Sequence, residues 1–375
     1  MPLDSVLELT KKMVSIQSTP GKEKKLCRYI KGQVEDSADE VELVKVSGIG
    51  PSLVAKHHAK DKDAPTVVLN GHLDTVDIAE GWDTDPFKAV IVDDKMYGLG
   101  VGDMKSGLAI ITDTFKKMSK EKDLNLVLTA VSDEEGNSLG TYNLIKKGKI
   151  DGDICLIPEP TGEMIMLGCR GRYVTDIIVH GKAAHGARPH LGVNAIEDAA
   201  RVINNLSRIK PRQHELLGRG SLCVLKIYGG GETLSVPERC VIRVDRHVVP
   251  GETRELVMDD YKKILTTLDI MSELTFTWME RPTPFLEPYI TKRSEFVKAF
   301  IFAHKEHMDL DENIVYGESV GDYNLFGKVM PTVVCGPEGQ NWHSPNEFVN
   351  MSSVIRVRDL YLGYMKAIAK RHGSN

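Results

Sequence analysis

The chain has 375 residues, of which 41% are hydrophobic, and its 48 basic and 53 acidic residues give a net charge of −5. This composition is typical of a folded protein with about 150 residues per domain, and it excludes a disordered chain or a small disulfide-stapled scaffold. The balanced charge and the lack of a run of roughly 18 apolar residues predict neither a nucleic-acid partner nor a membrane partner. The N-terminal segment lacks the basic head and apolar stretch of a signal peptide, so we expect a cytoplasmic protein.

The six cysteines are scattered along the chain without a C-x-x-C pair. This spacing argues against a zinc ribbon and against a redox motif. We expect the cysteines to be reduced and buried as small hydrophobic residues. Any metal site must therefore be built from histidine, aspartate and glutamate.

Hydrophobic residues recur at helical spacing before residue 40, which predicts two amphipathic helices. Strands and helices then alternate. The predicted strands are 41–46, 52–57, 66–70, 124–131 and 153–157, and the predicted helices among them are 105–117 and 139–146. Such alternation favours an α/β fold with a mostly parallel sheet, which binds its ligands at the carboxyl ends of the strands.

The pattern changes at about residue 172. The next predicted elements are a strand at 173–179, a helix at 194–209, strands at 221–228 and 240–247, a helix at 255–268 and a strand at 274–279. This β-α-β-β-α-β order is that of a ferredoxin-like unit. A predicted helix at 294–305, a strand at 331–335 and a helix at 352–370 then resume the α/β pattern. We therefore predict a discontinuous α/β domain, 1–171 and 284–375, interrupted by an inserted α+β domain, 172–283.

Acidic residues and histidines occur where predicted strands end or helices begin. They are His72 and Asp74 in NGHLDT, Asp103 after GLGVG, Glu134 and Glu135 in SDEE, Glu159 in PEP, and His343 in NWHSPNE. Each alone is usually a solvated turn or cap residue, but several follow strands of one predicted sheet. Imidazoles and carboxylates suit divalent cations, and a bridging carboxylate is typical of dinuclear hydrolytic sites. Two His, one Asp and two Glu would ligate, leaving one of the adjacent glutamates free to accept a proton.

The spacing of His72 and Asp74 suggests that the two residues have different roles at a metal site. Residues two apart on extended backbone point to the same side. One of the two side chains can then bind a metal ion while the other orients the imidazole.

Two other motifs point to different chemistry. GLGVGD resembles part of a dinucleotide fingerprint, but Asp103 replaces the third glycine and would repel a pyrophosphate. GESVG matches the nucleophile elbow of serine hydrolases around Ser319, with Asp322 and His343 downstream in a suggestive order. Few residues separate Ser319 from His343, and no long buried strand precedes the motif, so a serine hydrolase is the second hypothesis. The chain has no H-E-x-x-H motif, which excludes a mononuclear zinc protease of the zincin class.

The whole chain resembles the co-catalytic zinc amidohydrolases and exopeptidases through GHLDTV, YGLGVGDMKSG, SDEEGNSLGT, PEPT and HSPNE, in this order. This family includes acetylornithine deacetylase, succinyl-diaminopimelate desuccinylase, aminoacylase and glutamate carboxypeptidase. The resemblance implies an enzyme that cleaves an amide bond in a small-molecule substrate, an N-acyl amino acid or a short peptide. It also implies that the inserted domain is a lid and dimerisation domain, and therefore that the protein is a homodimer.

The resemblance implies a ligand set for two Zn²⁺ ions, and Co²⁺ or Mn²⁺ would suit the same residues. His72 and Glu159 would hold one ion. Glu135 and His343 would hold the other, and Asp103 would bridge the two.

Three catalytic roles are also implied by the resemblance. Glu134 would be the general base that takes a proton from a metal-activated water and later protonates the leaving amine. Asp74 would orient His72. His185, in GKAAHGARPHLGVNA, would reach the active site of the partner subunit and stabilise the oxyanion, although its sequence alone is that of an exposed loop residue.

The inserted domain departs from the family pattern at Ser235, where asparagine is common, and at His247, where a second arginine is common. Substrate identity therefore stays undetermined. Arg246 and Arg243 would bind a substrate carboxylate, or equally form ion pairs on a strand. The alternatives are a dipeptidase or aminopeptidase of the same family and a non-catalytic metal-binding homologue, although no proposed ligand or base is missing.

Overall fold

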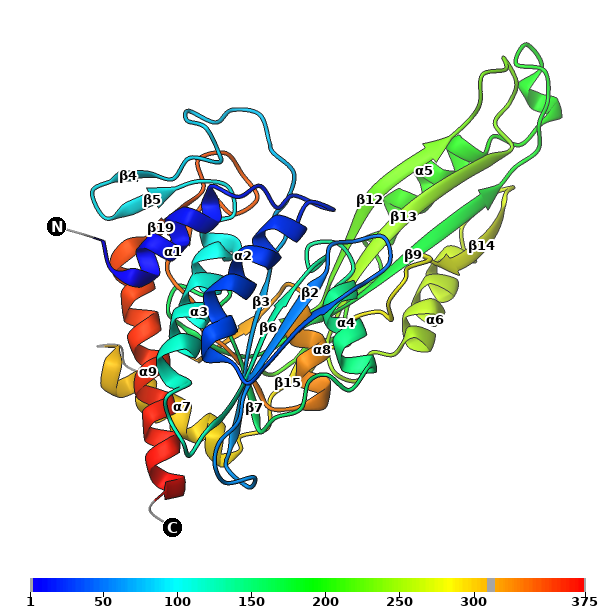
Figure 1. Ribbon diagram of the computed structural model, residues 1–375. Helices are drawn as coiled ribbons and strands as arrows, with labels where there is room; N and C mark the ends of the chain where they lie inside the picture. Colours follow the sequence, from blue (N-terminus) through cyan, green and yellow to red (C-terminus); the bar gives the residue numbers. More distant parts are fainter. Residues whose placement is uncertain (1–2, 309–313, 374–375) are drawn as a thin grey trace. The chain divides into compact units, whose positions relative to one another are not determined.

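The computed structural model describes residues 3–308 and 314–373. The chain forms two compact units (Figure 1). The first unit comprises Met1–Gly168, Ile290–Tyr316 and Gly321–Asn375, and the second comprises Cys169–Tyr289 and Gly317–Val320. Within the described ranges, no helix is both long and apolar enough to cross a membrane. The catalytic and dimerising roles expected of the two parts stay predictions.

The first unit is built on a nine-stranded sheet in the order β1-β2-β6-β3-β7-β17-β8-β15, with β16 paired to β8. Its strands are β1 (Glu40–Val44), β2 (Ser52–His57), β3 (Thr66–His72), β6 (Asn125–Val131), β7 (Ile154–Ile157), β8 (Ile165–Cys169), β15 (Tyr289–Ile290), β16 (Ile314–Gly317) and β17 (Thr332–Val334). The central strands β6, β3, β7 and β17 are parallel, whereas β2 and β8 join them antiparallel. The predicted α/β class with a mostly parallel sheet is confirmed.

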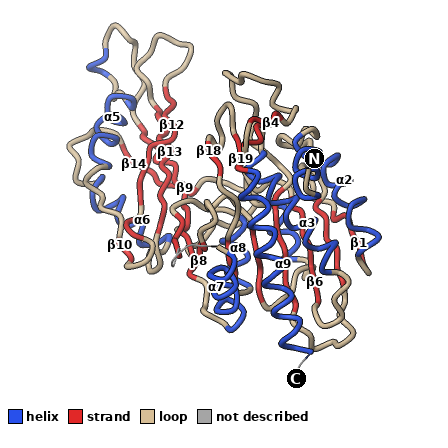
Figure 2. The backbone as a smooth tube through the Cα atoms, turned by 90° about the vertical axis from the view of Figure 1, so that its left-hand side faces the viewer, coloured by secondary structure: helices blue, strands red, loops and turns tan. Residues whose placement is uncertain are grey.

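Helices cover this sheet because its central strands are apolar on both faces. The helices α1 (Ser5–Val14), α2 (Lys24–Val34), α3 (Ser106–Met118) and α9 (Met351–Gly373) form one layer, with α7 (Glu295–His307) against α9 (Figures 1 and 2). The short helices α4 (Leu139–Lys146) and α8 (Asp322–Val329) contact each other on the other side of the sheet. The main core lies between the sheet and the first layer, where Leu69, Leu128, Ile110 and Tyr361 are fully buried.

A small four-stranded sheet, β18-β19-β5-β4, completes the first unit. Its strands are β4 (Val90–Val92), β5 (Lys95–Tyr97), β18 (Gly339–Gln340) and β19 (Phe348–Asn350). The antiparallel pairing of Phe348 with Tyr97 joins segments that are distant in the sequence. It therefore brings the chain just before Asp103 next to the chain just after His343.

The second unit is a four-stranded antiparallel sheet in the order β12-β13-β9-β14. Its elements are β9 (Gly171–His180), α5 (Ala195–Leu206), β12 (Ser221–Gly229), β13 (Arg239–Val248), α6 (Arg254–Leu265) and β14 (Glu273–Trp278), beside the two-stranded pair β10 (Gln213–His214) and β11 (Gly218–Arg219). Val202 of α5 and Tyr261 of α6 pack on Ile177 and Ile242 of the sheet. This arrangement confirms the predicted ferredoxin-like unit.

Candidate metal centre

Three acidic segments follow neighbouring parallel strands of the first unit. His72 is the last residue of β3, Glu134 and Glu135 follow β6, and Glu159 follows β7. The parallel register pairs His72 with Val131, the last residue of β6. The side chains therefore gather at one edge of the sheet, the edge at which α/β proteins bind their ligands.

Asp103 lies at the centre of the gathered side chains. Its Oδ1 lies 3.0 Å from Nε2 of His72, and its Oδ2 lies 3.2 Å from Nε2 of His343. The His72 nitrogen is also 3.7 Å from Glu159, and the His343 nitrogen is 3.0 Å from Glu135. Three donor groups result, each with ligand atoms within 4.8 Å of one another. Two of them share Asp103, namely His72-Asp103-Glu159 and Asp103-Glu135-His343, and the third is His72-Glu134-Glu135.

Glu134 belongs to neither of the two groups that share Asp103. One of its oxygens lies within 4.8 Å of donor atoms of His72 and Glu135. Its Oε1 accepts a hydrogen bond of 3.2 Å from the backbone N–H of Asp322, at the start of α8. Glu134 is thus beside the donor groups with its carboxylate held by a backbone donor.

The hydrogen bonds of Asp74 differ from those expected from the sequence. The Nδ1–H of His72 donates to the backbone carbonyl of Asp74 at 2.9 Å, whereas the Asp74 carboxylate is 3.9 Å away. That carboxylate instead accepts the backbone N–H groups of Glu134 and Glu135, at 3.2 and 3.0 Å. Because β3 ends at His72, strand alternation does not extend to Asp74, and orientation of His72 by Asp74 stays a prediction.

Electrostatics at the cluster reflect many acids in a small buried space. Burial raises the pKa values of Glu134 and Glu159 well above the usual range of a glutamate, and the neighbouring carboxylates raise both values further. Hydrogen bonds to Asp103 and Glu135 raise the pKa of His343 to about 10. Burial opposes ionisation of Asp103, but hydrogen bonds from both histidines outweigh it and lower the pKa. Bound cations would therefore stabilise the buried carboxylates of this cluster by neutralising their charge.

Two further buried acids lie near the donor groups, and the sequence did not predict a place for either of them at a metal site. Asp322, directly after GESVG, is 1% exposed, and burial raises its pKa to about 6. Glu347, the last residue of NWHSPNE, is also 1% exposed. Its carboxylate accepts the backbone N–H groups of Gly100, Gly102 and Asp103.

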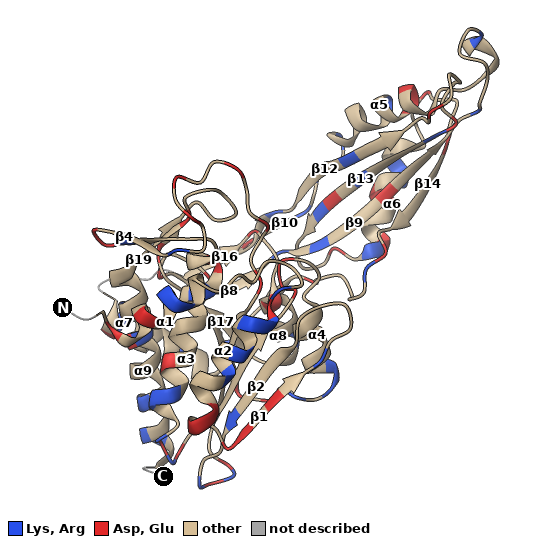
Figure 3. Cartoon of the chain, turned by 45° about the horizontal axis from the view of Figure 1, so that its top comes forward, with Lys and Arg blue, Asp and Glu red and all other residues tan. Residues whose placement is uncertain are grey.

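The predicted substrate-binding residues lie in the second unit and are engaged in ion pairs. The Arg246 side chain is fully buried and pairs with Glu252 at 2.6 Å. Arg243 makes two hydrogen bonds of 2.8 Å to Asp176 across the sheet, whose strands carry charges of both signs (Figure 3). This geometry favours ion pairing, the alternative weighed for these arginines, over binding of a substrate carboxylate.

The remaining predicted residues, His185 and Ser319, are exposed residues of the second unit. His185 accepts the backbone N–H of Ala187 at Nδ1 and forms an isolated β-bridge with Ser235. His343, the base that a serine hydrolase would require, has its Nε2 engaged by Asp103 and Glu135. Its position therefore disfavours the nucleophile-elbow hypothesis.

A cavity of about 450 Å³ adjoins the donor groups. Five acidic residues line it and no basic residue does; the acids are Glu23, Asp74, Asp77, Asp133 and Glu135. The cavity therefore suits an uncharged or positively charged part of a ligand better than an anionic one.

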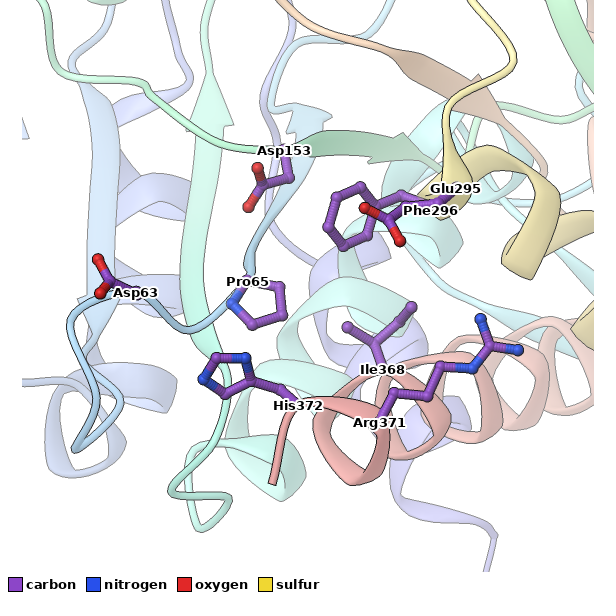
Figure 4. A pocket seen from close by; sticks show the side chains of 8 residues that line it. All are labelled: Asp63, Pro65, Asp153, Glu295, Phe296, Ile368, Arg371 and His372. Carbon is purple, nitrogen blue, oxygen red and sulfur yellow. The ribbon is translucent and has the colours of Figure 1, made fainter. Parts of the chain in front are cut away.

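Another cavity, of about 350 Å³, lies beside Pro65 before β3 and Asp153 before β7 (Figure 4). Its lining has both signs of charge, including Glu295 and Arg371. Because it adjoins the amino ends of the parallel strands, it lies at the edge opposite to the donor groups and is separate from them.

The parallel sheet and the converging donors at its carboxyl edge define a metal-binding α/β protein. The chain belongs to the peptidase family M20/M25/M40, whose pattern it matches over residues 68–367. The predicted family is therefore confirmed. The chain is a metal-dependent hydrolase that acts on amide bonds.

Similar proteins support this assignment. An acetylornithine deacetylase of Vibrio atlanticus is 28% identical, with 96% of this chain and 97% of that protein covered. A succinyl-diaminopimelate desuccinylase of Cupriavidus taiwanensis is 28% identical, with 84% and 85% covered. The crystal structure of the M20 family metallo-carboxypeptidase Sso-CP2 from Sulfolobus solfataricus matches the fold with a TM-score of 0.81 at 20% identity, covering 98% of this chain and 100% of that chain.

Proposed function

We propose that the chain hydrolyses the amide bond of an N-acyl amino acid or short peptide at a site with two metal ions. His72, Asp103 and Glu159 would hold one ion, and Asp103, Glu135 and His343 the other. The observation that carries this proposal is the sharing of Asp103 by two compact donor groups. Zn²⁺ is the ion proposed, since imidazole and carboxylate ligands suit it, as they also suit Co²⁺ and Mn²⁺.

The donor set fits such ions by number and by charge. Each group has one imidazole and two carboxylates, and three protein ligands are usual at catalytic zinc sites, which keep a further position for water or substrate. The Nδ1–H of His72 is already engaged by a carbonyl, so Nε2 is the nitrogen directed at the proposed ion. When bound, the ions would polarise the amide carbonyl and make a water acidic enough to lose a proton near neutral pH.

Glu134 is the proposed general base and acid. Its carboxylate takes a proton from the attacking water while the water oxygen forms a bond to the carbonyl carbon. The same carboxylate then delivers that proton to the amide nitrogen as the C–N bond breaks. Asp322 holds the Glu134 carboxylate through a backbone N–H, and Asp74 holds the backbone of Glu134, so the base is oriented from both sides.

The acidic cavity supports a preference among substrates. Asp74 and Glu135 belong to the surroundings of the proposed ions, whereas Glu23, Asp77 and Asp133 add further negative charge with no basic residue in the lining. We therefore propose substrates that carry a free amino group, as N-acetylornithine or an unblocked dipeptide does, rather than substrates with an extra carboxylate. The acetylornithine deacetylase relative is consistent with this preference.

The second unit supports a proposed homodimer. Its strand β12 lies at the edge of the sheet and exposes Leu225, Ile227 and Tyr228 by 49, 47 and 44%. An unpaired edge with exposed apolar side chains suits association with a second copy. In such a dimer His185 would serve the partner's active site, as the family resemblance implies. A cytoplasmic location is also proposed, since all six cysteines are unpaired.

The test is a panel of N-acyl amino acids and dipeptides, assayed with protein stripped by a chelator and reloaded with Zn²⁺, Co²⁺ or Mn²⁺. We expect activity to disappear on stripping, to return on reloading, and to be highest for substrates with a free amino group. Chelator-resistant hydrolysis that is lost in Ser319→Ala would instead support the serine hydrolase.

The shared ligand has its own test. Asp103→Ala is expected to lose both ions, because each donor group is left with two residues. Asp94→Asn is the matched control, since Asp94 is an acid that bonds Ser352 outside the donor groups. Two ions per chain in Asp103→Ala would contradict the proposed bridge.

A further inference from the structure

The glycine-rich segment before Asp103 surrounds a carboxylate of the chain itself. The backbone N–H groups of Gly100, Gly102 and Asp103 donate to Glu347, with distances of 2.7, 2.8 and 3.0 Å. Backbone N–H groups of one short segment that converge on an anion resemble the nest of a phosphate-binding loop, although here the N–H of Val101 bonds the carbonyl of Gly98 instead. Here the anion is internal, since the Glu347 carboxylate occupies the nest.

The glycines of this segment are explained by close packing. A Cβ atom on Gly102 would lie 1.9 Å from the ring of Trp342, and one on Gly100 would lie 2.2 Å from Cγ2 of Thr75. Gly100 also has a φ of 69°, which favours glycine. The resemblance to half a dinucleotide fingerprint therefore reflects the approach of another segment of the same chain.

That approaching segment carries His343. Glu347 lies in the same loop, and its backbone carbonyl also accepts the N–H of Gly98 at 3.1 Å. The next residue, Phe348, pairs with Tyr97 in the small sheet. The contacts of Glu347 thus fasten the segment that bears Asp103 to the segment that bears His343, although the two are 240 positions apart.

We propose that Glu347 is a positioning residue that fixes Asp103 relative to His343, so that both can bind the same metal ion. This inference rests on the proposed metal site. The Glu347 side chain is 1% exposed, so no water replaces its bonds. All three donors face a carboxylate that can accept them at once.

Glu347→Gln changes this arrangement with little change in shape. The amide has one acceptor oxygen, and its NH₂ group would face a backbone N–H, so at least one of the three bonds is lost. Loss of an outer partner of a metal ligand typically weakens metal binding about 10- to 100-fold. We expect that loss for the ion at Asp103 and His343 and a smaller effect for the ion at His72.

The experiment titrates Co²⁺ into full-length, chelator-stripped protein and follows the visible absorption, which reports ligand geometry, together with kcat and KM. Glu347→Gln is expected to bind one ion about 10- to 100-fold more weakly, with an altered spectrum and a lower kcat at similar KM. Glu347→Asp, which keeps the charge, is expected to recover part of the affinity. Glu338→Gln is the matched control, because it makes the same change at an exposed residue of the same region.

Each outcome separates this inference from the proposed function. Wild-type protein that binds no metal would defeat the proposed function itself. Two ions bound with wild-type affinities and spectra by Glu347→Gln would overturn only the positioning role. Equal loss of both ions in Glu347→Gln and Glu347→Asp would also overturn it, because the carboxylate would then support the fold and not one pair of ligands.

Discussion

Gly321 lies against the proposed general base, which makes it a sensitive position for substitution. A Cβ atom on Gly321 would lie 2.5 Å from Oε1 of Glu134 and 2.7 Å from Cε1 of Tyr323. The φ of Gly321 is −168°, an extended value that alanine adopts without strain. Gly321→Ala therefore reduces the space available to the Glu134 carboxylate and to the Tyr323 ring, and it leaves the backbone conformation accessible.

The expected magnitude follows from the contact distance. Ordinary contacts of a Cβ atom begin at about 3.4 Å, so the Glu134 oxygen must move by about 0.9 Å. A misplacement of about 1 Å at a catalytic group can cost about 100-fold in rate. We expect kcat to fall by that factor, equivalent to about 2.7 kcal/mol of transition-state stabilisation.

The assay compares kcat, KM and metal content of Gly321→Ala with those of the wild type on the best substrate of the panel. Metal content is expected to be unchanged, because Glu134 is outside the two proposed ligand groups. Gly32→Ala in α2 is the matched control, since a Cβ there meets nothing within 4 Å, and it should be neutral. A kcat for Gly321→Ala within about threefold of the wild type would refute the role given to the Glu134 carboxylate.

Three further predictions follow from the site and the core. Glu134→Gln should retain its metal content and lose about 10²- to 10⁴-fold in kcat, and near-normal turnover would contradict its role as base. Metal binding should release a proton from His343, whose pKa is raised to about 10 without metal. The apparent metal affinity should therefore increase as pH rises. Calorimetry in buffers of different ionisation enthalpy measures the proton release, and a pH-independent affinity would contradict this prediction. Arg358→Met should lower the free energy of unfolding by about 3 kcal/mol, because it removes the buried guanidinium that pairs with both Asp4 and Asp113 and leaves Asp113 with Lys117 as its cation. A loss below about 1 kcal/mol in urea denaturation would refute this estimate.

The sequence predicted the long and strongly patterned elements well. Strand 52–57 and helix 139–146 coincide with β2 and α4, because their hydrophobic patterns have clear periods. The predicted strand 66–70 extends to His72 in β3, so it ends at a candidate ligand. Helix α8 (Asp322–Val329) was missed, since eight residues with an internal glycine carry little periodic signal.

The site could be predicted where local rules apply. His72 and Glu135 were nominated because they end or follow apolar strands, and a parallel sheet brings such ends together. The roles of Glu347 and Asp322 depend on contacts between distant segments, such as the bond from Gly102 to Glu347 across 245 positions. No local pattern reports such contacts, so these two residues required the structure.

The location of bound metal tests the central claim most directly. Crystals of the protein grown with Zn²⁺ would be measured at the zinc absorption edge, where anomalous peaks mark the ions. We expect two peaks roughly 3.5–4 Å apart on either side of the Asp103 carboxylate, one next to His72 and one next to His343. A single peak, or peaks confined to another place such as the cavity beside Asp153, would contradict this expectation.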